Sequence, residues 1–276
     1  ISGIADIFEK DPKQVEEYAV NLLNGIKQSQ ALVPTKNEEA FSRELADAMF
    51  VNMSRRFDKK EGGPNKAPKF PLPNNYVFLL DYAVLTENEK ALEQVELTLD
   101  KMARGGIYDQ IGGGFARYST DELWKVPHFE KMLYDNAQLI SLYSKALQVF
   151  GKAEYKMVIC ETIEFLEREM RGKKGQFYSA LDADSEGIEG KFYIWKPEEL
   201  KELLNGDYPL FERYYNVNDL GEWEHNYILL RDGSDSVFAK ARSPESSTLP
   251  SIRSERLGSV RTSMGISASF FKTICR

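Results

Sequence analysis

Neither a surplus of positive charge nor a long apolar run occurs in this sequence of 276 residues. Its 36 Lys and Arg residues are outnumbered by 43 Asp and Glu residues, and the charges are interspersed, so we expect no nucleic-acid partner. The most apolar stretch, residues 76–85, is too short to cross a bilayer and contains Asp81. We therefore expect no contact with a membrane.

Cysteines and nucleotide-binding motifs are scarce as well. Cys160 and Cys275 lie far apart and form no CxxC motif, which indicates neither a disulfide framework nor a zinc site. Residues 1–14 lack the cationic start and apolar run of a signal peptide. The glycine run at 112–115 matches neither common nucleotide-binding glycine motif. We expect a cytoplasmic protein without cofactor or metal, and the absence of an initial methionine is typical of a fragment or processed chain.

Helical spacing of apolar residues covers most of residues 11–215 and predicts an all-α fold. The first segment has Asp11 as a candidate N-cap and Pro12 at the first helical position. Two strand-like runs, at 176–181 and 191–195, predict a small β-hairpin around an acidic turn. The helices are expected at residues 11–28, 37–57, 74–86, 88–104, 128–149, 153–171, 197–205 and 208–215.

The connections between these helices alternate in length. The long ones are residues 58–73, 105–127 and 172–196, and short links separate them. Helices joined by short links pack antiparallel, so all long loops should lie at one end. This layout predicts a partial six-hairpin α/α toroid with small β-hairpins in its long loops and a pocket at the loop-rich end. The residues expected at that end are Lys69, Phe70, Asp109, Arg117, Trp124, His128 and Asp182.

One of the two histidines begins the stretch that gives the candidate catalytic residues. Pro127 suits the first position of a helix, which places His128 and Glu130 in its first turn. At 100° per residue these two side chains point about 160° apart, so they form no facing pair within an ideal helix. The candidate catalytic residues are His128, Glu130 and Asp109. The alternative is structural: Glu130 complements the helix dipole, and His128 is a hydrogen-bonded structural residue.

The long loops combine glycine, aromatic and charged residues, which suits stacking against sugar rings. The alternative is that their aromatic residues simply plug the end of the bundle. We also expect an ion pair of Arg117 or Lys125 with a loop carboxylate to hold residues 116–125 as a hairpin. The candidate binding residues are Lys69, Phe70, Arg117, Tyr118, Trp124, Tyr134, Asp135, Asp182, Asp184 and Glu186.

The acidic turn at 182–190 matches only the first half of a calcium loop. Its twelfth position is Tyr193, where a calcium loop needs a bidentate glutamate, so we expect no calcium there. Two interpretations stay open. The turn is a solvated hairpin, or its carboxylates reach over the pocket as acid, base or acceptors for sugar hydroxyls.

Three runs of sequence resemble a known family. They are APKFPLP, GGIYDQIGGGFARYSTDELWKVPHFEKMLYDNAQL and ALDADSEGIEGKFYIW, and the likeness to thioredoxin-domain-containing proteins related to the spermatogenesis-associated thioredoxin-like protein spans about residues 5–230. The resemblance implies a six-hairpin α/α toroid, similar to those of glycosidases and sugar epimerases, that follows a thioredoxin-like domain. This chain is then expected to hold about half of the ring and to contact both the other half and that domain. The sequence differs from the usual family pattern at one place, the stretch GGPNK that precedes the first run.

The end of the chain departs further. From Asp232 onward the sequence is serine-rich and loses helical periodicity. We therefore divide the chain into a partial toroid at 1–231 and an irregular tail at 232–276. The tail is interpreted either as a disordered linker or as the product of a reading-frame error.

Three functions are compatible with these residues. A carbohydrate-active enzyme is favoured, either a glycoside hydrolase that uses two carboxylates or a sugar epimerase that uses His128 as base. The alternatives are a non-catalytic sugar- or peptide-binding module and a structural partner of the thioredoxin-like domain. The ligand expected of the enzyme is a sugar, and that of the binding module is a sugar or a peptide. Because half a ring leaves apolar edges bare, we also expect this chain alone to self-associate and to lack activity.

Overall fold

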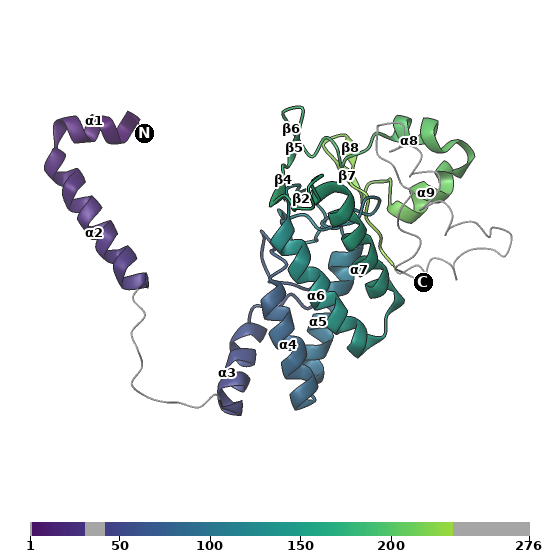
Figure 1. The fold of residues 1–276 in the computed structure, drawn as a ribbon, viewed down its shortest axis with the longest axis horizontal. Coiled ribbons are helices and arrows are strands. Elements are labelled where there is room, and N and C mark those ends of the chain that lie inside the picture. The colour runs from purple at the N-terminus through teal and green to yellow at the C-terminus, as the bar shows by residue number, and fades with distance from the viewer. Residues whose placement is uncertain (1, 31–41, 234–276) are drawn as a thin grey trace. The chain divides into compact units, whose positions relative to one another are not determined.

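The fold is described from a computed structural model, in which residues 2–30 and 42–233 are placed (Figure 1). They fall into two compact units, residues 1–45 and residues 46–276. The predicted domain boundary between residues 231 and 232 lies close to the end of the described residues. Cys275 lies outside them. The helices and strands are α1 (Ser2–Lys10), α2 (Pro12–Gln30), α3 (Arg43–Ser54), α4 (Pro73–Thr86), α5 (Glu89–Arg104), β1 (Tyr118–Ser119), β2 (Pro127–His128), β3 (Lys131–Met132), α6 (Leu133–Phe150), α7 (Ala153–Phe165), β4 (Ala180–Leu181), β5 (Asp184–Ser185), β6 (Ile188–Glu189), α8 (Pro197–Leu204), α9 (Tyr208–Tyr215), β7 (Glu222–Trp223) and β8 (Asn226–Tyr227).

The first unit contains the helices α1 and α2. The sequence predicted α2, and its N-cap is confirmed: Oδ1 of Asp11 accepts a hydrogen bond of 3.1 Å from the backbone N–H of Gln14. Pro12 occupies the first helical position, where its missing N–H costs nothing. The helix α1 was not predicted. The first ten residues are too few to show a helical period by themselves.

The second unit is built on two stacked helical hairpins, α4 with α5 and α6 with α7 (Figure 1). In each hairpin the first helix ends at a residue with left-handed backbone conformation, Glu87 after α4 and Gly151 after α6. Asn88 then caps α5 by accepting a hydrogen bond from the N–H of Ala91. Because α4 also contacts α6 and α5 also contacts α7, the hairpins stack in two layers. The predicted all-α class with small β-hairpins is confirmed.

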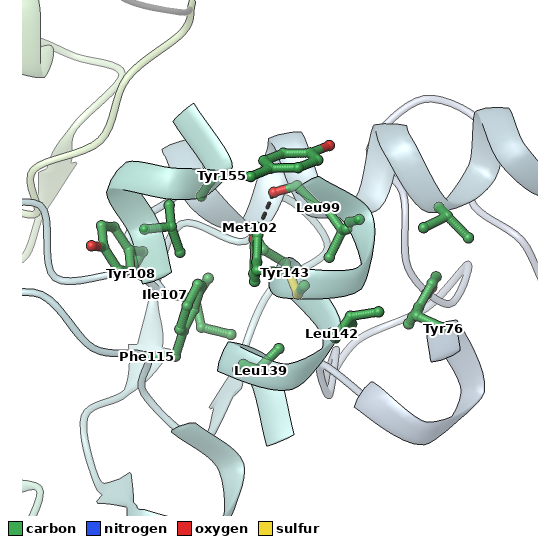
Figure 2. Packing of buried hydrophobic residues seen from close by; sticks show 14 of the residues in the cluster. Tyr76, Leu99, Met102, Ile107, Tyr108, Phe115, Leu139, Leu142, Tyr143 and Tyr155 are labelled. Carbon is green, nitrogen blue, oxygen red and sulfur yellow. Dashed lines mark hydrogen bonds between the residues drawn. The ribbon is translucent and has the colours of Figure 1, made fainter. Parts of the chain in front are cut away.

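The main core lies between these helices and the loop 105–127 (Figure 2). Aromatic rings fill much of it, with Phe115 stacked on Tyr143 and Tyr143 set edge-on to Tyr155. The hydroxyl of Tyr143 donates a hydrogen bond of 2.8 Å to the carbonyl of Leu99, so this buried polar group is satisfied. The rest of the cluster is aliphatic, including Leu79, Val95, Met102, Leu139 and Leu142.

The three long loops meet at one end of the helices, as predicted. Lys69 of the first loop forms an antiparallel bridge with Ser119 of the second. Met132, which follows the second loop, pairs with Ala180 of the third through the strands β3 and β4. Within the second loop, Tyr118 pairs with His128 across β1 and β2. The loops therefore form one continuous layer of short hairpins over the bundle.

A smaller apolar cluster packs α8 against α9 and the chain that follows. It contains Leu200, Phe211 and Leu229. The buried Arg231 ties this region to the main bundle, because its guanidinium donates to Gln110 and forms an ion pair with Glu154. Within residues 2–30 and 42–233, no helix is both long and apolar enough to cross a membrane.

Two expectations about the loop-rich end are corrected. The helix expected from residue 128 begins at Leu133, because residues 127–132 are extended and pair on both sides through β2 and β3. The strand-like runs at 176–181 and 191–195 do not pair with each other. The hairpin forms inside the acidic turn instead, between β5 and β6.

Candidate functional site

The extended segment 127–132 has two faces. Pro127, Phe129 and Lys131 are buried, whereas His128 and Glu130 between them are partly exposed. This alternation is the two-residue period of a β-strand. We call the first set the inner face and the second set the outer face. The alternation places His128 and Glu130 on the same side, unlike the helix predicted from the sequence.

The inner face is fully occupied by protein contacts. The ammonium of Lys131 lies 2.9 Å from Oδ2 of Asp109 and 4.5 and 4.7 Å from the ring centroids of Phe165 and Tyr193. Oδ1 of Asp109 accepts hydrogen bonds from the backbone N–H groups of Ile111 and Gly112. The cavity beside these groups measures about 30 Å³, which suits a water molecule and not a sugar. Asp109 is therefore not brought to the outer face, and its contacts are those of a structural residue.

Two predicted binding residues also lie in the interior. Lys69 is fully buried, and its ammonium donates to Oδ2 of Asp58 at 2.7 Å and to the carbonyl of Gly62 at 2.8 Å. Trp124 is fully buried too, and its indole N–H donates to the carbonyl of Glu61. Neither side chain is accessible to a substrate. Lys69 ties the two ends of the first long loop together, and Trp124 of the second loop binds the backbone of the first.

The outer face carries a linked set of charged groups. Nδ1 of His128 lies 2.7 Å from Oε1 of Glu189, and its Nε2 lies 3.8 Å from Oε2 of Glu130. The same oxygen of Glu130 accepts a hydrogen bond of 3.0 Å from the guanidinium of Arg117. We call Arg117, His128, Glu130, Asp135 and Glu189 the outer cluster.

Asp135 is the unusual member of the outer cluster. It lies in the first turn of α6, and its Oδ2 is buried without a hydrogen-bond partner among the described residues. Burial raises the pKa of Asp135 to about 6; the Arg117 guanidinium acts in the opposite direction and the Glu130 carboxylate adds to the increase. This carboxyl group therefore changes protonation state close to neutral pH.

Three rings form a column beside these charges. The ring of Tyr118 lies 4.7 Å from that of Phe70 and 5.1 Å from that of His128, centroid to centroid. Phe70 ends the column and is 39% exposed. Tyr134, at the start of α6, is 48% exposed. This ring column, Phe70, Tyr118 and His128, offers apolar surface next to carboxylates, the combination that sugar rings bind.

The acidic hairpin contributes a residue that the sequence reading missed. Of its predicted members, Asp182 accepts a hydrogen bond from the N–H of Asp184, and Glu186 forms an ion pair with Lys191 at the tip. The residue that reaches the outer cluster is Glu189, which pairs with Asp184 across the hairpin. A two-residue turn with glycine second, at 186–187, was the available signal for this register.

The hairpin predicted at residues 116–125 forms, but different contacts hold it. Oδ1 and Oδ2 of Asp121 accept hydrogen bonds from the N–H groups of Leu123, Lys125 and Val126. Arg117 pairs with Glu130 and not with a carboxylate of the loop. The Lys125 ammonium donates to the backbone carbonyl of Glu222. An Asx-type turn thus replaces the predicted ion pair.

Comparison with known proteins identifies relatives of this chain. It is 43% identical over 165 residues to human spermatogenesis-associated protein 20, covering 56% of this chain and 21% of that protein. The mouse protein of the same name is 39% identical over 189 residues, covering 65% of this chain and 24% of that protein. The chain is similar to spermatogenesis-associated protein 20 over the matched residues. The family resemblance seen in the sequence is thereby confirmed.

Other comparisons are more distant. An uncharacterized protein of Caenorhabditis elegans is 38% identical over 200 residues, covering 65% of this chain and 27% of that protein. The chain thus spans only 21% to 27% of the length of spermatogenesis-associated protein 20 and this nematode relative. No known family profile matches the chain. Among solved structures, a family 76 glycoside hydrolase from a bovine Bacteroides thetaiotaomicron strain gives a TM-score of 0.44 at 18% identity, covering 52% of this chain and 32% of that one.

Proposed function

We propose that the outer cluster is the substrate-contacting face of a carbohydrate-active enzyme that cleaves a glycosidic bond. The observation that supports this most is the contrast between two neighbouring carboxyl groups. Asp135 is partly buried, with its pKa raised to about 6, whereas Glu130 is ion-paired with Arg117. Glycoside hydrolysis uses such a pair, one carboxyl group as proton donor and one as carboxylate.

The roles follow from these environments. Asp135 gives its proton to the glycosidic oxygen as the bond between that oxygen and the anomeric carbon breaks. Glu130 either removes a proton from a water whose oxygen attacks the anomeric carbon, or attacks that carbon itself to form a glycosyl-enzyme ester, which water then hydrolyses with Asp135 as the base. The ring column holds the apolar face of the sugar, and Arg117 keeps Glu130 in place.

The test is hydrolysis of a panel of end-labelled oligosaccharides by the intact protein that contains this chain, because the chain alone is expected to lack activity. We expect Asp135→Asn to lower kcat by about 10²- to 10⁴-fold, the usual contribution of a general acid. Glu93→Gln is a matched control, because Glu93 is an exposed residue of α5 away from the loop-rich end. Full activity of Asp135→Asn would remove Asp135 from this role. Binding of the panel without turnover would instead favour a sugar-binding module.

An epimerase is the second candidate, and a specific contact favours it. The 2.7 Å contact between Glu189 and Nδ1 of His128 fixes the imidazole ring, as a general base requires. This reaction would exchange a proton at a carbon next to the sugar carbonyl. Solvent deuterium should then enter the sugar with the wild-type chain and not with His128→Asn. A sugar returned without deuterium would leave hydrolysis as the proposal.

The remaining expectations stay predictions. They are contact with a thioredoxin-like domain and with further hairpins of a ring, the absence of nucleic-acid and membrane partners, the absence of a cofactor, and a cytoplasmic location. Fractionation of cells and co-purification with separately produced domains would test the location and the domain contacts.

A further inference from the structure

The charges around the ring column bear on the kind of sugar that fits the outer cluster. Arg117 already has Glu130 as an ion-pair partner at 3.0 Å. His128, whose imidazole can become positive, lies 2.7 Å from Glu189. Each group able to attract an anion is therefore already paired with a carboxylate.

At the β5–β6 hairpin, the third loop adds two carboxylates that have no ion-pair partner among the described residues. Asp184 stands opposite Glu189 in the β5–β6 hairpin, and Asp182 accepts a hydrogen bond from the N–H of Asp184. Both aspartates are exposed, and neither has an ion-pair partner in the described parts of the chain. Lys191, the lysine that follows the hairpin, forms its ion pair with Glu186 at the tip. Exposed and uncompensated carboxylates thus border the outer cluster.

We infer that the outer cluster accepts a sugar that is uncharged or carries an ammonium group, and that it excludes sugar phosphates and uronic acids. Like charges brought together across a binding surface oppose association, and a field of one sign lowers the local concentration of ligands of that sign. An ammonium group gains from the same field and from the faces of the aromatic rings. The inference rests on the proposed function, because it assumes that the ligand is a sugar.

Matched sugars separate charge from stereochemistry. For the gluco, manno and galacto series, binding of the methyl glycoside, the 2-amino sugar and the uronic acid to the full chain is measured by ligand-observed NMR at low ionic strength. In the series that binds, we expect the amino sugar to bind most tightly and the uronic acid to bind at least about tenfold more weakly than the methyl glycoside. Added salt should reduce the difference, because it screens exposed charges.

Variants identify which carboxylates cause the exclusion. The double substitution Asp182→Asn and Asp184→Asn keeps the side-chain shape and removes two charges, so it should strengthen uronic-acid binding and weaken amino-sugar binding. The double substitution Glu89→Gln and Glu93→Gln removes two exposed charges near the start of α5 and should change neither. Circular dichroism of each variant confirms that it is folded.

Each outcome has a distinct meaning. A uronic acid that binds as tightly as its methyl glycoside overturns the inference and leaves the proposed function standing. Equal effects of the two double variants overturn the assignment to Asp182 and Asp184. If no sugar of any series binds in any charge state, both the inference and the proposed function are overturned.

Discussion

Glu130 and Lys131 are neighbours in the chain, yet their side chains lie in different environments. On the inner face, Lys131 is paired with Asp109 and enclosed by aromatic rings. On the outer face, Glu130 is partly exposed beside Asp135, which has a buried oxygen without a partner. Fully satisfied polar groups stabilise a fold, whereas an unsatisfied carboxyl group costs stability and is free to react. The comparison indicates that inner-face residues stabilise the fold, and it supports the proposal that outer-face residues contact a ligand.

The largest effect that would test this comparison is expected at Trp124. Replacing this fully buried side chain with alanine should lower the free energy of unfolding by about 3–5 kcal/mol. Tyr134→Ala, which truncates an exposed ring next to Asp135, should change it by less than about 0.5 kcal/mol. Urea denaturation measures both. Similar losses in the two variants would show that the ring of Tyr134 is as structural as that of Trp124.

The buried Lys69 gives the next largest effect. Lys69→Ala removes a partner from Asp58 and from the carbonyl of Gly62, and should cost about 3 kcal/mol. Lys60→Ala is the matched control on the same loop, because its side chain is 89% exposed and contributes about 0–1 kcal/mol.

The Lys69 variant should also depend on pH. Burial raises the pKa of Asp58. Hydrogen bonds from the N–H groups of Glu61 and Lys60 and from Lys69 lower this pKa by more than burial raises it, so the net shift is downward. A lowered folded-state pKa stabilises the fold above the unfolded value, about 3.9, and this contribution is lost as pH falls. The difference in the free energy of unfolding between wild type and Lys69→Ala should therefore shrink below about pH 4. A difference that stays constant there would show that Lys69 acts by packing and not by charge.

A smaller effect on the free energy of unfolding is expected at Asp121, whose carboxylate holds the turn that precedes the extended segment 127–132. Asp121→Ala removes the acceptor of three backbone N–H groups and should cost about 1–2 kcal/mol. Glu122→Ala, at the exposed neighbouring position, should be nearly neutral. Because the turn leads directly into β2, the Asp121 variant should also weaken sugar binding. Unchanged sugar binding would separate the turn from the site.

The smallest change in the free energy of unfolding is expected on substitution of Asp135, and this substitution should stabilise the fold. Its folded-state pKa, about 6, lies above the unfolded value of about 3.9, so ionisation destabilises the fold as pH rises through this interval. Asp135→Asn removes this cost and should raise the unfolding free energy at pH 7 by about 1 kcal/mol, allowing for partial exposure. Between about pH 4 and 6, the free energy of unfolding of the variant should change less with pH than that of the wild type. A loss of stability at neutral pH would show that the carboxylate has a structural partner.

The sequence alone determined the helical class, the positions of most helices and the gathering of the long loops. These follow from local periodicity and from the antiparallel packing that short links impose. It also gave Asp135 as a candidate binding residue, and the structure places it in the first turn of α6. Local patterns were sufficient wherever neighbours in the chain are also neighbours in space.

Only the tertiary structure decided which candidates meet. Residues 127–132 have the composition of a helix start, but pairing with β1 and β4 keeps them extended and turns His128 and Glu130 to one side. Lys69 and Trp124, two candidate binding residues, are buried by contacts with the first long loop. Asp109, a candidate catalytic residue, is engaged by Lys131 instead. Glu189 acquired its contact with His128 through a hairpin register. The turn at 186–187 indicates the hairpin register, but which residues each of these segments meets depends on contacts with other parts of the fold, and local patterns do not specify those contacts.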